Sequence, residues 1–211
     1  MSEPSARAQV VETVAPAILH WTLEDDRIHN RSDSYAIETP DGNVLIDPLP
    51  LKESALGDLG EIRAICLTGR FHQRAAWRYQ EHFSVPVYAP KNGKGYEGEP
   101  DHLYESGDML PGNLKVVHAP GPTDAHYNFY YTSDNLKAMF IADLLIRRSA
   151  DNIFRFVPGQ FMDNPDLTRE SARNLLNYDI DLLCPNHGAV QKGNVHQVIR
   201  EALEHDLEKG Q

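Results

Sequence analysis

The stretch ICLTGRFHQRAAW, residues 65–77, joins an apolar run to a helix-like run through a loop that contains a glycine. The apolar run belongs to EIRAICLT (61–68), whose length and β-branched content predict a buried strand. The segment HQRAAWRYQEHF (72–83) has apolar side chains at helical spacing and predicts a helix. Proteins of the α/β class often place their chemistry in such a loop. This loop has one histidine, two arginines and no carboxylate, which raises the question of whether it is an active-site loop that has lost its ligands.

The rest of the chain predicts a strand-rich domain with few helices. Alternating apolar runs lie on both sides of TPDGN (39–43), and Asp-Gly between such runs is a strong hairpin signal. Further strands are expected at 85–90, 113–120, 126–133, 136–146 and 179–188, and helices at 166–178 and from 195 onward. This order favours an antiparallel-rich core of two sheets with outer helices over a doubly wound parallel sheet.

Composition limits the classes of partner. The chain has 211 residues, which is enough for one sizeable core, and its net charge is −11. That charge argues against a nucleic-acid partner and an anionic membrane surface, because both recruit clustered Lys and Arg. The two cysteines form no disulfide framework, and no apolar segment has the length of a membrane span or a signal peptide. We therefore expect a cytoplasmic protein, and a small-molecule ligand or a homo-oligomer remains open.

Three segments in the first two thirds of the chain resemble, in order, those of the metallo-β-lactamase fold superfamily, the αββα sandwich hydrolases. DSYAIETPDGNVLIDPLP (33–50) is similar to the opening hairpin, whose second strand ends in an aspartate, here Asp47. ICLTGRFHQRAAW stands where that family has Thr-His-x-His-x-Asp-His before a helix. VVHAPGPTDAHYNFYY (116–131) stands where it has Pro-Gly-His-Thr.

Two further segments complete the resemblance, which spans about residues 18 to 205. AMFIADLLI (138–146) matches the strand that ends in a bridging aspartate, here Asp143, and LLCPNHGAV (182–190) matches Pro-Gly-His-Gly, here with His187. The resemblance implies an α/β (α+β) protein, a four-layer αββα sandwich of two mixed, largely antiparallel sheets with outer helices. We expect residues 18–211 to form one such domain and residues 1–17 to be an N-terminal arm or an added strand.

The resemblance also implies two metal ions held by about seven side chains, and here this sequence departs from the family. Two matched positions keep a ligand, Asp143 and His187. The other five positions lack a suitable donor and hold Gly69, Phe71, Gln73, Arg74 and Pro122. Glycine, phenylalanine and proline have no donor atom, and arginine is a fixed cation that repels a metal. We therefore expect no dinuclear centre and no cofactor.

The positions that match the family's site predict one ligand-binding cleft, lined by Gly69, Arg70, His72, Arg74, His126, Asp143 and His187. The first hypothesis is a hydrolase-like pseudoenzyme that retains this cleft for a small molecule or a partner. The alternative is a hydrolase of an ester, thioester or lactone that uses one zinc or iron ion, held by Asp143 and His187 with His72 or His126. A third hypothesis, a purely structural protein, would be marked by a large exposed apolar patch.

Two geometric expectations follow from the resemblance. Asp47, Thr68, Asp143 and His187 should lie at the ends of different strands and converge on the cleft. Without metal ions, a partly buried Asp143 needs a cation nearby. Arg74 is expected to contact Asp143 directly or through one water molecule, and Arg70 is the alternative partner.

Overall fold

The computed structural model describes residues 3–148 and 151–209, and two β-sheets form its centre. The first sheet has seven strands in the order of the chain: β1 (Glu12–Ala15), β2 (Ile18–Asp25), β3 (Asn30–Ile37), β4 (Asn43–Ile46), β5 (Ile62–Cys66), β6 (Val87–Pro90) and β7 (His102–Tyr104). Its pairs are antiparallel from β1 to β4 and parallel from β4 to β7. The sheet is therefore mixed.

The second sheet has six strands and is antiparallel except at one pair. Its order is β15 (Gln191–Lys192), β14 (Leu182–Pro185), β11 (Leu136–Ala142), β10 (Tyr127–Ser133), β9 (Leu114–His118) and β8 (Met109–Leu110). The strands β11 and β14 run parallel, so both end at the same edge of the sheet. Two short strands, β12 (Ile146–Arg147) and β13 (Phe154–Arg155), pair separately.

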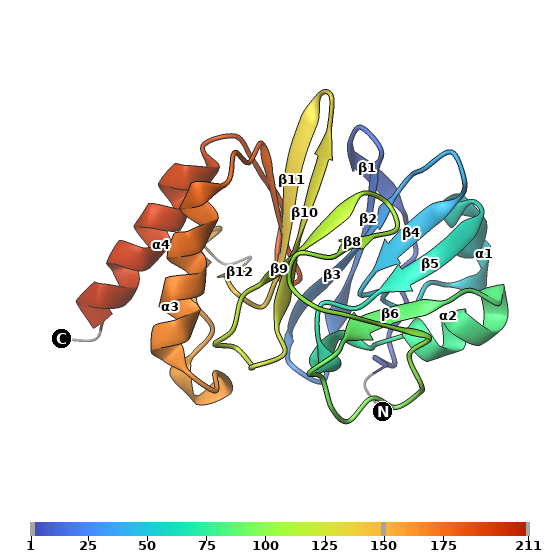
Figure 1. Cartoon of the computed structure of the whole chain (residues 1–211), viewed down its shortest axis with the longest axis horizontal. Coiled ribbons are helices and arrows are strands. Elements are labelled where there is room, and N and C mark those ends of the chain that lie inside the picture. The colour runs from blue at the N-terminus through green and yellow to red at the C-terminus, as the bar shows by residue number, and fades with distance from the viewer. Residues whose placement is uncertain (1–2, 149–150, 210–211) are drawn as a thin grey trace.

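Helices cover the outer face of each sheet. Figure 1 shows α3 (Pro165–Asn174) and α4 (Val195–Lys209) packed together on one side of the molecule, and α1 (Glu53–Leu56) and α2 (Ala76–Phe83) on the other. The 3₁₀ helices are η1 (Gly57–Leu59), η2 (Arg70–His72), η3 (Gly159–Phe161) and η4 (Leu175–Asn177). Among the described residues, no helix combines the length and the apolar character that crossing a bilayer requires.

Three buried clusters fill the spaces between these four layers. The central cluster lies between the sheets and contains Tyr35, Cys66 and Phe129, while the two outer clusters lie beneath the helices. Successive side chains of strand β5 point to opposite faces of the sheet. Cys66 faces the central cluster, and Ile65 faces the outer cluster that includes residues of α2. The predicted αββα sandwich of two mixed sheets is thus confirmed.

Several predicted elements are shorter than the sequence indicated, and two of these differences shape the site. The helix expected from residue 72 begins at Ala76, because Arg74 has a φ of 44° and cannot belong to a regular helix. The strand expected over 136–146 ends at Ala142, whose φ is 45°. Left-handed conformations at these positions turn the chain away from the regular elements. As a result Asp143 lies in a turn at the edge of the second sheet.

Candidate functional site

The ends of four strands meet at one edge of the sandwich, as expected. Asp47 follows β4, Thr68 follows β5, Asp143 follows β11 and His187 follows β14. The buried carboxylate of Asp47 accepts hydrogen bonds from the main-chain N–H of Thr68 (2.8 Å), from its hydroxyl (2.6 Å) and from the side-chain amide of Asn186 (2.6 Å). Asp47 therefore ties the ends of both sheets together.

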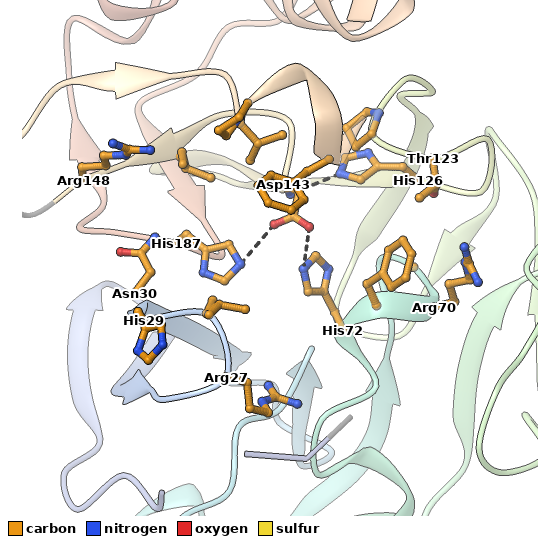
Figure 2. Close-up of a pocket in the computed structure, with 18 of the residues that line it drawn as sticks. Arg27, His29, Asn30, Arg70, His72, Thr123, His126, Asp143, Arg148 and His187 are labelled. Carbon is orange, nitrogen blue, oxygen red and sulfur yellow. Dashed lines mark hydrogen bonds and ion pairs between the residues drawn. The ribbon is translucent and has the colours of Figure 1, made fainter. Parts of the chain in front are cut away.

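Asp143 lies between two histidines from different sheets. Its Oδ2 is 3.1 Å from Nε2 of His72, and its Oδ1 is 3.2 Å from Nε2 of His187. One ligand atom from each of the three residues lies within 4.8 Å of the others. Figure 2 shows the two imidazole rings converging on the carboxylate from either side. We call His72, Asp143 and His187 the His-Asp-His cluster.

The protonation of His187 follows from its partner on β3. Nδ1 of His187 is 2.8 Å from the main-chain oxygen of Arg31. A carbonyl oxygen only accepts, so Nδ1 carries a proton and donates it. In the neutral ring, Nε2 then has a lone pair, and this lone pair faces Oδ1 of Asp143.

The protonation of His72 follows from a chain of two hydrogen bonds. Nδ1 of His72 is 3.1 Å from Oγ1 of Thr68, and that hydroxyl donates its single proton to Asp47. The Thr68 oxygen must therefore accept from His72, which places a proton on Nδ1. The Nε2 atom of a neutral His72 also directs a lone pair at Asp143.

The carboxylate of Asp143 consequently requires positive charge. Burial raises its pKa, but His72 and His187, when they carry a proton on Nε2, lower it more strongly, so the pKa then lies well below the ordinary aspartate value. Its Oδ1 is buried, and among the described residues the contact with Nε2 of His187 does not supply it with a hydrogen bond. Either a proton on each Nε2 or a shared cation would satisfy this arrangement.

His126, the other histidine considered as a ligand, lies beside the cluster but is already engaged. Its Nδ1 donates to the oxygen of Ala119 (2.9 Å), and its Nε2 accepts from the main-chain N–H of Asp143 (3.2 Å). Burial lowers its pKa to about 4. His126 therefore stays neutral at physiological pH and positions the main chain of Asp143.

The expected direct ion pair between Arg74 and Asp143 is absent from the described residues. The guanidinium of Arg74 instead donates to the oxygen of Asp33 (2.6 Å), the oxygen of Asp47 (3.1 Å) and the hydroxyl of Ser34 (3.2 Å). Burial lowers the pKa of Arg74, and the carboxylates of Asp47 and Asp143 oppose that shift. Arg74 thus satisfies main-chain acceptors within β3 and directly after β4, and it contributes charge to Asp143 only at longer range.

The alternative partner, Arg70, is exposed and does not reach Asp143 either. Its guanidinium lies over the ring of Phe71, 4.2 Å from the ring centre. The Gln73 amide donates to the oxygen of Arg70 and accepts from the indole of Trp77 and the N–H of Glu97. Gln73 therefore holds its loop together instead of presenting a ligand.

The cluster opens into a cavity of about 850 Å³. Six of the seven predicted cleft residues line it: Gly69, Arg70, His72, His126, Asp143 and His187. The seventh, Arg74, lines an adjoining cavity of about 700 Å³, which also reaches the cluster. The predicted residues thus line two adjoining cavities, and the His-Asp-His cluster lies where these cavities adjoin.

The sequence did not indicate the support of His187 by Asp33. The fully buried carboxylate of Asp33 accepts from the N–H of Gly188 (2.7 Å), from Arg31 and from His20. Gly188 has a φ of 116°, and a Cβ atom there would lie 2.0 Å from the oxygen of Arg147. An acidic residue at an inward-facing strand position was the one available signal, since buried carboxylates need partners.

The fold and cluster were compared with known proteins. Neither a family model nor a curated protein matches the sequence. DIM-1 metallo-β-lactamase superposes with a TM-score of 0.74 at 16% identity, covering 95% of this chain and 99% of that one. A metallo-β-lactamase from Pontibacter korlensis gives a TM-score of 0.71 at 17% identity, with 92% and 98% covered. The chain has the metallo-β-lactamase fold.

A flavoprotein from Thermotoga maritima has the same fold over part of its length. Its TM-score is 0.72 at 17% identity, covering 92% of this chain and 60% of that one. Identities this low show that the folds are similar, and they do not show that this chain shares the activity of those proteins.

Proposed function

We propose that this protein is a hydrolase that binds one divalent metal ion through His72, Asp143 and His187 and acts on an ester, thioester or lactone. The observation that carries the proposal is the orientation of the two imidazoles. The Nδ1–H group of each imidazole donates a hydrogen bond to an oxygen atom, and the Nε2 atom of each points at the carboxylate of Asp143. Histidines that bind metals are held in this way, with the second nitrogen donating to an oxygen.

The donor set suits a single metal ion and not two. Two imidazoles and one carboxylate are the ligands of many mononuclear zinc and iron sites that keep open positions for water and substrate. Among the described residues, this is the one group of three or more potential ligands close enough together to hold a metal ion. A bound ion would supply Lewis-acid activation of water and of a substrate carbonyl.

The chain's own residues would fix the geometry of the reaction. Asp47 and Thr68 hold the ring of His72, and the oxygen of Arg31 holds the ring of His187. His126 holds the main chain of Asp143. Thr123 lines the cavity near the cluster and offers a hydroxyl to a substrate oxygen.

A metal-free binding protein is the second candidate, and Arg74 favours it. This buried cation occupies a position where the resemblance implies a ligand. If both imidazoles of the cluster were protonated, they would neutralise Asp143 without a metal. The cavity would then serve a ligand without chemistry, as the pseudoenzyme hypothesis holds.

Elemental analysis of protein purified without added metal or chelator distinguishes these candidates. We expect about one equivalent of zinc or iron per chain, since three ligands and open positions suit one ion. His187→Ala should lose this metal, while His118→Ala should retain it, because His118 is exposed and bonded to the oxygen of Asp124. Metal-free protein that takes up no zinc or iron would favour the second candidate, and two equivalents would contradict both.

Asp47→Asn tests how the ring of His72 is held. The side-chain amide that this substitution introduces could donate a hydrogen bond to the Thr68 hydroxyl, where the Asp47 carboxylate only accepts one. The Thr68 hydroxyl could then donate to Nδ1 of His72, so the proton on Nδ1 would no longer be fixed. We expect the metal affinity to fall about 10- to 100-fold, as when residues that orient metal ligands are changed. Metal titration of folded protein measures this. Asp41→Asn is the control, because the carboxylate of Asp41 is exposed. Equal metal affinities of the Asp47→Asn variant and the parent protein would contradict the proposed role of Thr68.

A further inference from the structure

Three exposed apolar side chains surround the opening above the cluster. Ile28 is 49% exposed, Phe71 57% and Phe161 66%, and all three line both the larger and the smaller cavity, at the opening that the two share. They come from the β2–β3 turn, from η2 and from η3, which are far apart in the sequence. Exposed apolar groups gathered around a cavity mark a ligand-binding surface.

The two cavities that share the cluster differ in character. Residues that line only the larger one include the apolar Ile146, Val157 and Pro158, beside polar residues such as Glu24 and His29. Those that line only the smaller one are mainly polar: Asp25, Ser32, Gln73, Glu97, Gln160 and Asp163. An apolar group of a ligand is therefore better accommodated in the larger cavity, because burying it there displaces water from apolar walls.

The larger cavity also holds arginines on opposite sides of the cluster. Figure 2 shows Arg148 beyond His187 and Arg70 beyond His72. Both are exposed, and among the described residues neither has a carboxylate partner, whereas Arg27 is paired with Asp25. In a chain with 31 acidic and 20 basic residues, guanidinium groups left without acidic partners at a cavity are binding groups for an anion.

We propose that the larger cavity binds an anionic acyl group. Its apolar chain lies on Ile28, Phe71 and Phe161, and its negative charge pairs with Arg148. This rests on the proposed hydrolase function for the cleavage itself, which would take place at the His-Asp-His cluster. The substrate class is then an ester or thioester of an apolar acid that carries a second, negatively charged group.

Calorimetric binding of octanesulfonate and of 1-octanol tests this without catalysis. A sulfonate is anionic and a weak metal ligand, so the protein is studied both as isolated and after chelator treatment. We expect the sulfonate to bind more tightly than the alcohol in both preparations. Phe161→Ser should weaken both probes about tenfold, since it removes a large apolar contact.

Arg148→Gln should weaken the sulfonate about fivefold and leave the alcohol unchanged. Leu103→Ser and Arg200→Gln are the matched controls, because Leu103 is 58% exposed on β7 and Arg200 is exposed on α4, both away from the cavity. They should bind both probes like the parent protein. No binding, equal affinity for the two probes, or equal losses in the control variants would overturn the proposal.

The probe-binding experiment and the measurement of metal uptake test the binding site and the hydrolase function separately. Sulfonate binding that depends on Phe161 and Arg148 in a protein that never takes up metal would support the binding site and contradict the hydrolase. A protein that takes up one metal ion but binds neither probe would contradict the binding site alone.

Discussion

Chelation of the protein as isolated is expected to lower its free energy of unfolding by about 3–4 kcal/mol, the amount by which a ligand at 100 to 1,000 times its dissociation constant stabilises a protein. The reason is that the cluster joins loops from both sheets, and a metal ion there would bind the folded chain and not the unfolded one. Asp143→Ala should abolish this response, because it removes the ligand that lies between His72 and His187. Thermal or denaturant unfolding with and without chelator measures the difference.

Asp134→Ala is the control for this experiment. Asp134 is an exposed carboxylate in the turn between β10 and β11, the hairpin whose second strand leads to Asp143. This variant should lose stability on chelation as the parent protein does. A parent protein that unfolds identically with and without chelator, after incubation with zinc and with iron, would contradict the metal site.

Arg74→Ala is expected to destabilise the fold by about 3–5 kcal/mol, because each buried acceptor left without its donor costs about 1–3 kcal/mol. Arg74 is 3% exposed, and its guanidinium donates to Asp33, Ser34 and Asp47. The truncation leaves main-chain acceptors without donors, one within β3 and one directly after β4, and opens a cavity. Chemical denaturation monitored by circular dichroism measures the loss.

Arg63→Ala provides the comparison for Arg74. Its guanidinium pairs with the exposed carboxylate of Asp41, so its loss should cost less than about 1 kcal/mol. Arg74→Lys should recover only part of the stability, because an ammonium group does not reproduce the reach and planar geometry of a guanidinium. Equal stability of the Arg74→Ala and parent proteins would show that the strand ends do not depend on this side chain.

Much of the fold was predictable from local patterns. The Asp41-Gly42 turn joins β3 to β4 with antiparallel pairing, as the sequence indicated, and Gly42 has the positive φ that such turns need. The layer order followed from the succession of strands and helices. The ends of α2 and β11 were placed wrongly, because Arg74 and Ala142 have left-handed backbones that no apolar pattern reveals.

The candidate site was predictable in part. Asp143 and His187 follow strands of one parallel pair, so their proximity could be inferred from topology. The direct contact between Arg74 and Asp143 that the charge argument allowed is not formed among the described residues, because that argument does not distinguish which of several nearby cations has the right reach. The buried main-chain oxygens of Asp33 and Asp47, which Arg74 satisfies, have no signature in the sequence.

The sequence by itself indicated a two-sheet core with outer helices, because this depends on periodicity and order along the chain. The four-layer sandwich and the strand ends at which the site lies were implied by the resemblance of five segments to the metallo-β-lactamase fold superfamily. It also excluded the full ligand set of a dinuclear centre, because Gly69, Phe71 and Pro122 have no donor atoms. Only the tertiary structure decided that His72 joins Asp143 and His187 while His126 does not. The Nδ1 acceptor of His72 is Thr68, four residues earlier in the same loop. The Nδ1 acceptor of His187 is the oxygen of Arg31 on the other sheet, and the two imidazoles come together at Asp143 only when the two sheets pack against each other.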